Sequence, residues 1–146
     1  KGSGWVRMLS VRKGEARKAG SDAAGLLNLA SGRAGTGKVV ATTGVRGLEP
    51  VAFAAHLPAG EPATMKLDKL YVLPEHHGRG VGRKLIDAVA SAARERFCNT
   101  VILNVNKRNV QAIAAYGRHG FAIRESVVVP IGGGFVMDDH VMELPL

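Results

Sequence analysis

The alternation of apolar and polar residues divides this chain into several short strands and two helices. Clusters of glycine, proline and polar residues separate the apolar runs, as is typical of strands joined by turns. The order of the segments, with strands first and then helices between later strands, predicts a mixed α/β sheet. Strands are expected at Val39–Thr43, Val51–Leu57, Met65–Leu73, Thr100–Val105, Ile123–Val129 and near Asp139–Leu144, with a loop at Pro130–Gly134.

Two segments have the period of a helix with one buried face. In the first, over residues 82–97, apolar residues recur every four positions with others beside them. The second helix is expected from Asn109 to His119, where Asn109 is a good N-cap and Gly120 a good terminator. The face that we expect to be buried in the first helix consists of Leu85, Ile86, Val89, Ala90, Ala93 and Phe97.

The N-terminal third has a weaker pattern. Trp5–Val11 alternates enough for a first strand, and Asp22–Leu29 is compatible with a helix that Gly32 breaks. Residues 32–39 nearly spell a nucleotide-binding P-loop, but Val39 stands where a hydroxyl must ligate magnesium. A strand-like run also follows where a helix should start, so we exclude a P-loop. The first four residues lack an initiator Met and are read as an added extension or a trimmed start.

Length and composition indicate one globular domain over residues 1–146. The apolar content is 46%, and no segment is long, apolar and uncharged, so we expect no membrane span and no signal peptide. Cys98 is the single cysteine, which excludes an internal disulfide and suits a reducing compartment. We therefore expect a cytoplasmic protein.

The positive charge is concentrated in the first third. The formal net charge is +8, and residues 1–50 carry nine Lys or Arg against three acids. Such a segment could contact RNA or another anionic surface through counterion release. However, Trp5 is its only aromatic residue, so it offers no stacking platform. We do not expect a nucleic-acid partner, although salt-dependent RNA retention would support one.

The most informative feature is a glycine-rich turn, residues 74–83, between the strand ending at Leu73 and the first helix. Gly78, Gly80 and Gly82 remove three β-carbons where the backbone enters the helix. An anion can then approach free N–H groups and the positive end of the helix dipole. This pattern predicts a pyrophosphate site. A dinucleotide fingerprint is excluded because Arg83 occupies its third glycine position.

Two motifs together resemble one family, the GNAT superfamily of N-acetyltransferases. The turn from His77 to Gly82 is similar to its acyl-CoA-binding pattern Gln/Arg-x-x-Gly-x-Gly/Ala, with His77 departing at the first position. The segment from Asn109 to Phe121 matches Asn-x-x-Ala-x-x-x-Tyr-x-x-x-Gly-Phe at every fixed position. The resemblance covers roughly residues 64–146.

The resemblance implies a GNAT-like mixed α+β fold. Its central, mostly antiparallel sheet contains two splayed parallel strands, flanked by helices, and acetyl-CoA binds where these strands separate. By this resemblance the main chain of one splayed strand pairs with the pantetheine arm, the glycine turn holds the diphosphate, and Asn109 contacts the pantetheine. No metal is expected. The implied cofactor-binding residues are Leu70, Tyr71, Val72, His77, Gly78, Arg79, Gly80, Val81, Gly82, Arg83 and Asn109.

The implied reaction is direct attack of a primary amine on acetyl-CoA. Tyr116 is the catalytic candidate, as a hydrogen-bond donor to the leaving thiolate. Full proton donation from a tyrosine near pKa 10 to a thiolate near 8.5 would be uphill by roughly 2 kcal/mol. Lys66 stands where many relatives place the glutamate that acts as the general base. The group that takes the proton from the amine therefore stays open, and the alternatives are Asp68, His56, residues 138–140 or a water chain.

Two further questions stay open at this point. The missing glutamate and the short N-terminal third also fit a non-catalytic acyl-CoA-binding or regulatory module on the same fold. The acceptor amine and the oligomeric state are not specified, and a homodimer is one of the expected assemblies.

Overall fold

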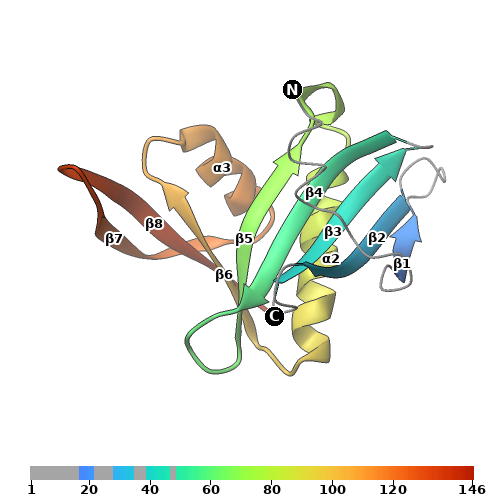
Figure 1. Ribbon diagram of the computed structural model, residues 1–146, viewed down its shortest axis with the longest axis horizontal. Coiled ribbons are helices and arrows are strands. Elements are labelled where there is room, and N and C mark those ends of the chain that lie inside the picture. The colour runs from blue at the N-terminus through green and yellow to red at the C-terminus, as the bar shows by residue number, and fades with distance from the viewer. Residues whose placement is uncertain (1–16, 22–27, 35–38, 47–48) are drawn as a thin grey trace.

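The computed structural model describes residues 17–21, 28–34, 39–46 and 49–146, and these residues form one eight-stranded sheet with two α-helices (Figure 1). The strand order is β1-β2-β3-β4-β5-β6-β8-β7. The sheet is therefore the predicted mixed α+β type. Its elements are β1 (Arg17–Ser21), β2 (Asn28–Ala34), β3 (Val39–Arg46), β4 (Glu49–Pro58), β5 (Thr64–Val72), the 3-10 turn η1 (Pro74–His76), α2 (Val81–Glu95), β6 (Thr100–Asn106), α3 (Val110–Arg118), β7 (Ala122–Gly132) and β8 (Phe135–Pro145).

The first five strands form an antiparallel meander, as Figure 1 shows. The strands predicted around residues 39–43, 51–57 and 65–73 are confirmed as β3, β4 and β5. The helix predicted over Asp22–Leu29 is wrong at its end, because Asn28 and Leu29 begin β2 and pair with Val45 and Gly44 of β3. Cross-strand pairing thus overrides local helix preference there. The predicted strand at Trp5–Val11 and the rest of the predicted helix lie outside the described residues.

Two parallel strands form the centre of the sheet. β5 pairs with β6 in parallel, and β6 pairs with β8 in an antiparallel ladder that spans the whole of β6. β7 and β8 form a hairpin that extends well beyond the body of the molecule in Figure 1. The loop expected at Pro130–Gly134 is shorter than predicted. Positive φ angles at Gly132, Gly133 and Gly134 close the turn tightly, which lets both strands continue almost to its tip.

The core lies between the sheet and α2. This helix packs against β3, β4, β5 and β6, and it buries six side chains. One predicted core residue is exposed: Phe97 is 91% exposed, because α2 ends at Glu95 and Phe97 turns away with φ 61°. The buried residues of α2 are Val81, Leu85, Ile86, Val89, Ala90 and Ala93, which pack with Met65, Leu67, Val101, Leu103 and Met142 of the strands.

The second helix, α3, is shorter and buries no residue completely. Ala112, Ile113 and Tyr116 pack on the core while staying half-buried. Asn109 caps its N-terminus, since Oδ1 accepts a hydrogen bond from the Ala112 N–H at 3.2 Å. Asn109 therefore acts as the predicted N-cap.

Candidate functional site

The parallel strands β5 and β6 separate soon after they meet. Their pairing covers only Thr64–Lys66 of β5 and Thr100–Ile102 of β6, and beyond Lys66 β5 is hydrogen-bonded on one side only, to β4. Figure 1 shows the two arrows diverging toward their tips. The second half of β5 therefore presents an unpaired backbone edge toward β6.

The hydrogen bond at the end of β5 determines which main-chain groups face this edge. The Leu73 N–H donates to the Val51 carbonyl of β4 at 2.8 Å. Because N–H and C=O groups alternate sides along a strand, the main chain of Tyr71 faces β4 as well. The main-chain groups of Leu70 and Val72 face the opening. Of the three positions that the resemblance implies, these two can pair with an amide-containing ligand.

A β-bulge lies where β5 leaves β6. The register passes from Ala55↔Lys69 to His56↔Leu67, which leaves Asp68 without a partner in β4. A bulge bends a strand and increases its local twist, and it redirects nearby groups. The exposed Asp68 side chain is thereby placed at the point where the opening begins.

The glycine turn connects β5 with α2. Gly78 and Gly80 have φ angles of 73° and 77°, which glycine adopts without the strain that a β-carbon causes. Gly80 is the N-cap of α2, and no side chain caps the helix. The first N–H groups of a helix have no acceptor within the helix itself, and no side chain caps those of α2. Together with the helix dipole, such donors favour an anionic ligand.

His77 fastens this turn to the end of β5. Its Nε2 lies 2.8 Å from the carbonyl oxygen of Val72. Since a carbonyl oxygen only accepts, the ring N–H is the donor in this bond. The side chain that departs from the family pattern thus ties the turn to the strand. Sequence reasoning did not find this role, because it depends on how the turn folds back.

The two residues singled out on α3 differ in their surroundings. Asn109 uses its carbonyl oxygen as the helix cap, so its amide N–H groups stay available to a ligand. Tyr116 packs edge-on against Phe121, with ring centroids 5.6 Å apart. Burial raises the pKa of the Tyr116 phenol above its ordinary value of 10.0. A phenol with a raised pKa is a weaker acid, which suits a hydrogen-bond donor better than a full proton donor.

His56 lies away from the opening. It is buried near the paired end of β5, with Nδ1 3.3 Å from Met65 Sδ. Burial, with a smaller contribution from Arg96, lowers the pKa of His56 to about 4. Arg96 follows the last turn of α2, so His56 is close to the helix end opposite the glycine turn.

In the segment 138–140 near the C-terminus, two of the three side chains already have partners within the protein. Asp138 forms an ion pair with Lys107, and the His140 ring lies 3.0 Å from Ser126 Oγ. Asp139 is buried opposite Asn106, the last residue of β6. In the part of the chain that the structure describes, no three His, Cys, Asp or Glu side chains gather as metal ligands.

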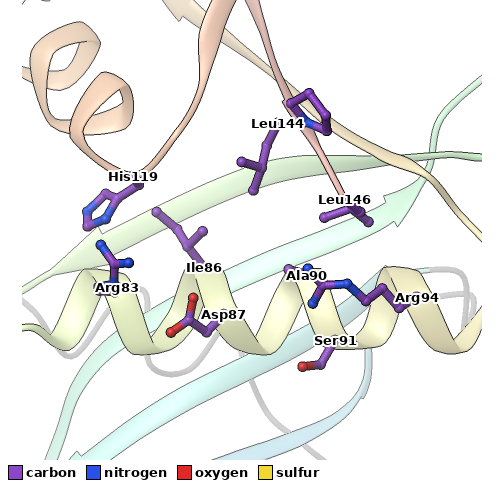
Figure 2. A pocket seen from close by; sticks show the side chains of 10 residues that line it. Arg83, Ile86, Asp87, Ala90, Ser91, Arg94, His119, Leu144 and Leu146 are labelled. Carbon is purple, nitrogen blue, oxygen red and sulfur yellow. The ribbon is translucent and has the colours of Figure 1, made fainter.

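A groove of about 230 Å³ continues from the glycine turn along α2. Figure 2 shows Arg83 pointing toward His119, at the end of α3, and Arg94 extending back along α2 toward Ala90. Sequence reasoning included Arg83 but missed His119 and Arg94, which are distant in sequence and follow no motif. The remaining lining residues are Ile86, Asp87, Ser91, Leu144, Pro145 and Leu146.

The helices of the described residues are all too short or too polar to cross a bilayer.

Comparison with known proteins gives a consistent result. The model of the acetyltransferase (GNAT) family matches residues 9–121. An uncharacterized N-acetyltransferase of Mycobacterium tuberculosis is 33% identical over 88 residues, which are 60% of this chain and 56% of the relative. The chain thus spans about half the length of this curated relative.

Solved structures share the fold. Nourseothricin acetyltransferase aligns with a TM-score of 0.69 and 17% identity over 98% of this chain and 93% of its own. A putative streptothricin acetyltransferase from Bacillus anthracis, crystallised with acetyl coenzyme A, aligns with a TM-score of 0.68 and 17% identity. That alignment covers 75% of this chain and 63% of the other.

Proposed function

This chain belongs to the acetyltransferase (GNAT) family, and on that premise we propose that it transfers the acetyl group of acetyl-CoA to a primary amine. The observation that carries the proposal is the unpaired edge of β5 beside the uncapped start of α2. One element offers main-chain partners for an amide-containing arm, and the other offers donors for a diphosphate. Coenzyme A contains these two groups next to each other.

In this proposal the chain contributes mainly backbone groups to cofactor binding. The N–H groups of residues 78–83 and the side chains of Arg79 and Arg83 hold the diphosphate. The main-chain groups of Leu70 and the N–H of Val72 pair with the pantetheine amides, while the Val72 carbonyl accepts the hydrogen bond from His77. The amide nitrogen of Asn109 donates to the same arm. A main-chain N–H of β5 polarises the thioester carbonyl, which lowers the energy of the developing oxyanion.

The transfer itself needs a proton acceptor and a donor. The amine nitrogen attacks the carbonyl carbon, the C–S bond breaks, and the sulfur leaves as a thiolate. Tyr116 donates a hydrogen bond to that sulfur. Asp68, in the bulge of β5, is the side chain best placed to take the amine proton, directly or through water. His56 is a poor candidate because it is buried near the other end of the strand.

Unfolding with and without acetyl-CoA tests the proposal. Ligand at about 100 times its dissociation constant should add roughly 2.7 kcal/mol to the free energy of unfolding. NAD, ATP and magnesium should add nothing, and equal stabilisation by ATP would contradict the assignment. Thiol release with a panel of primary amines then measures turnover. Binding without thiol release against every amine would instead favour a non-catalytic acyl-CoA-binding module.

We also propose that the chain forms a homodimer through the β7–β8 hairpin. β7 is the last strand of the described sheet, so its outer edge is unpaired there. An edge strand can pair with its own copy across a two-fold axis. Six apolar residues at the outer end are each 45–72% exposed, which is unusual for side chains of this kind unless a partner covers them. They are Val128, Val129, Ile131, Phe135, Val136 and Met137.

Light scattering measures this assembly directly. The wild type should have the mass of a dimer and the Phe135→Asp variant that of a monomer. Phe97→Asp, which alters an exposed aromatic residue in the turn after α2, should leave the dimer intact. A monomeric wild type, or a dimeric Phe135→Asp variant, would overturn the proposed interface.

A further inference from the structure

Strand register shows which residues lie on each face of the sheet beside the opening between β5 and β6. Leu103 and Val105 of β6 belong to the core that packs on α2, so they lie on the face that the helix covers. Successive side chains of a strand point to opposite faces, which puts Asn104 and Asn106 on the other side of the sheet. Asp139 of β8 pairs with Asn106 and therefore lies on that same side, which we call the second face.

The bulge of β5 turns Asp68 toward the second face as well. Leu67 before the bulge and Leu70 after it both pack on the core. Two residues separate them, Asp68 and Lys69, and both are exposed. The bulge thus interrupts the strict alternation of the strand and places two successive side chains away from the core. Asp68, the proposed proton acceptor, lies on the second face at the start of the opening.

Asp139 is a buried carboxylate without a partner. It is 4% exposed, and among the described residues no donor or cation pairs with its side chain. Its two neighbours differ, because Asp138 pairs with Lys107 and His140 with Ser126. Burial of an unpaired carboxylate costs free energy, and a cationic partner offsets that cost. Asp139 is therefore suited to bind a positively charged ligand.

The other charges favour a cation on the β8 side of the second face. Lys66 and Lys69 place positive charge on β5, where they repel a cationic ligand. Three other carboxylates form ion pairs with Arg124, and these are Glu61, Glu125 and Glu143. Asp139 thus differs from these acids in that the protein does not neutralise it within the described residues.

One strand, β6, separates Asp139 from the opening. The order of these strands is β5-β6-β8, and neighbouring paired strands lie about 4.8 Å apart. The carboxylate is therefore roughly 5–10 Å from the far side of β6, where the reacting amine meets acetyl-CoA in the proposed function. A second nitrogen a few bonds farther along the same acceptor can reach that distance.

We propose that the acceptor is a diamine or polyamine and that Asp139 binds its second, cationic nitrogen. This inference rests on the proposed function and specifies the class of acceptor. The ammonium donates charge-assisted hydrogen bonds to the carboxylate of Asp139. The reacting nitrogen lies at the opening beside Asp68. A monoamine leaves Asp139 unpaired, so it is the poorer substrate.

Acetylation of matched acceptors tests the inference. The acceptors are the linear diamines of butane, pentane and hexane and the amino alcohols of the same chain lengths, in which a hydroxyl replaces the second ammonium. In the wild type, kcat/KM for the best diamine should exceed that for its amino alcohol at least about tenfold, as expected for a charge-assisted hydrogen bond. A ratio no larger than the statistical factor from two equivalent amines would overturn the inference.

A matched pair of variants assigns the preference to Asp139. In Asp139→Asn the ratio should fall to the statistical factor, and the loss should appear in KM for the diamine and not in kcat. Asp138→Asn removes the same charge from the next residue, whose side chain points to the other face and pairs with Lys107, so the ratio should persist. An unchanged ratio in Asp139→Asn, or equal losses in the two variants, would contradict the proposal.

Unfolding separates a binding role of Asp139 from a structural one. Because the carboxylate has no partner among the described residues, Asp139→Asn should keep or raise the free energy of unfolding. A lower value would indicate that the carboxylate stabilises the fold, and it would refute the binding role. If acetyl-CoA binds but no amine releases thiol, the proposed function itself fails. Equal rates with diamines and amino alcohols would refute only the acceptor class, so the two failures are distinguishable.

Discussion

The two ends of β5 differ in how their backbone is used. At the first end, Met65 and Lys66 are paired on both sides, and Met65 is buried beside His56. At the other end, β5 is paired with β4 only, and the strand runs into a turn that leads to the uncapped start of α2. One strand thus combines a closed end that stabilises the fold with an open end that leaves groups for a ligand.

This difference implies that stability and binding can be perturbed separately. The closed end contributes buried apolar surface and complete hydrogen bonding, so changes there should reduce the free energy of unfolding. The open end contributes little burial, so changes there should reduce affinity or turnover. The following predictions test this separation, in order of decreasing effect.

The largest effect is expected for Met65→Ala. Met65 is 1% exposed, and truncation of such a residue leaves a cavity that costs about 2–5 kcal/mol. Val72→Ala, at the half-buried open end of the same strand, should cost only about 1 kcal/mol. Urea unfolding of the two variants measures both values. Equal costs would show that the ends of β5 do not differ in this way.

The second prediction concerns acid and His56. With a folded pKa of about 4 and an unfolded value of 6.5, the unfolded chain binds the proton more tightly. The contribution of His56 is therefore complete above pH 6.5 and is lost as the pH falls toward 4. The expected loss is about 3 kcal/mol.

Unfolding at several pH values, in wild type and His56→Leu, isolates this contribution. In His56→Leu, the free energy of unfolding should change much less between pH 6.5 and pH 4 than it does in the wild type. Other titrating groups affect both proteins alike. The same slope in both proteins would exclude His56 as the cause.

At the open end, Gly80→Ala should affect binding more than folding. A β-carbon at φ 77° costs about 1 kcal/mol of strain, although it would meet no atom within 4 Å. The strain distorts the turn, so the dissociation constant for acetyl-CoA should rise more than about tenfold, or 1.4 kcal/mol. Gly60→Ala, in the loop at the closed end, also has open space and should change neither quantity. Unchanged affinity in Gly80→Ala would remove this turn from the binding site.

The smallest effect is expected for Tyr116→Phe. The phenol ring packs against Phe121 and stays in place in the variant, so only the hydroxyl is lost. Loss of one neutral hydrogen bond to the sulfur should lower kcat by roughly tenfold, or about 1.4 kcal/mol. The affinity for coenzyme A should not change. Unchanged turnover would remove Tyr116 from the mechanism.

Much of the fold could be predicted from local patterns. The helix with Leu85 and Val89 on its buried face, the cap at Asn109 and the glycine turn depend on residues close together in the chain. Their backbone angles and periodicity follow from neighbouring side chains, so the sequence is sufficient. Phe97 shows the limit of this reasoning, because the period continues one turn further than the helix does.

Other features depend on contacts between distant segments. The bulge at Asp68 and the early separation of β5 from β6 result from how three strands fit together. His119 and Arg83 line the same groove although 36 positions of sequence separate them. They meet because the end of α3 lies near the start of α2. The local periodicity of the sequence does not indicate which distant segments come into contact.

The sequence alone therefore determined where the glycine-rich turn and two amphipathic helices occur, because each is encoded within a few successive residues. Tertiary structure alone decided which backbone edge stays unpaired and which side chains join the turn. Those choices depend on packing among elements, which minimises buried unpaired groups over the whole molecule and not within any one segment.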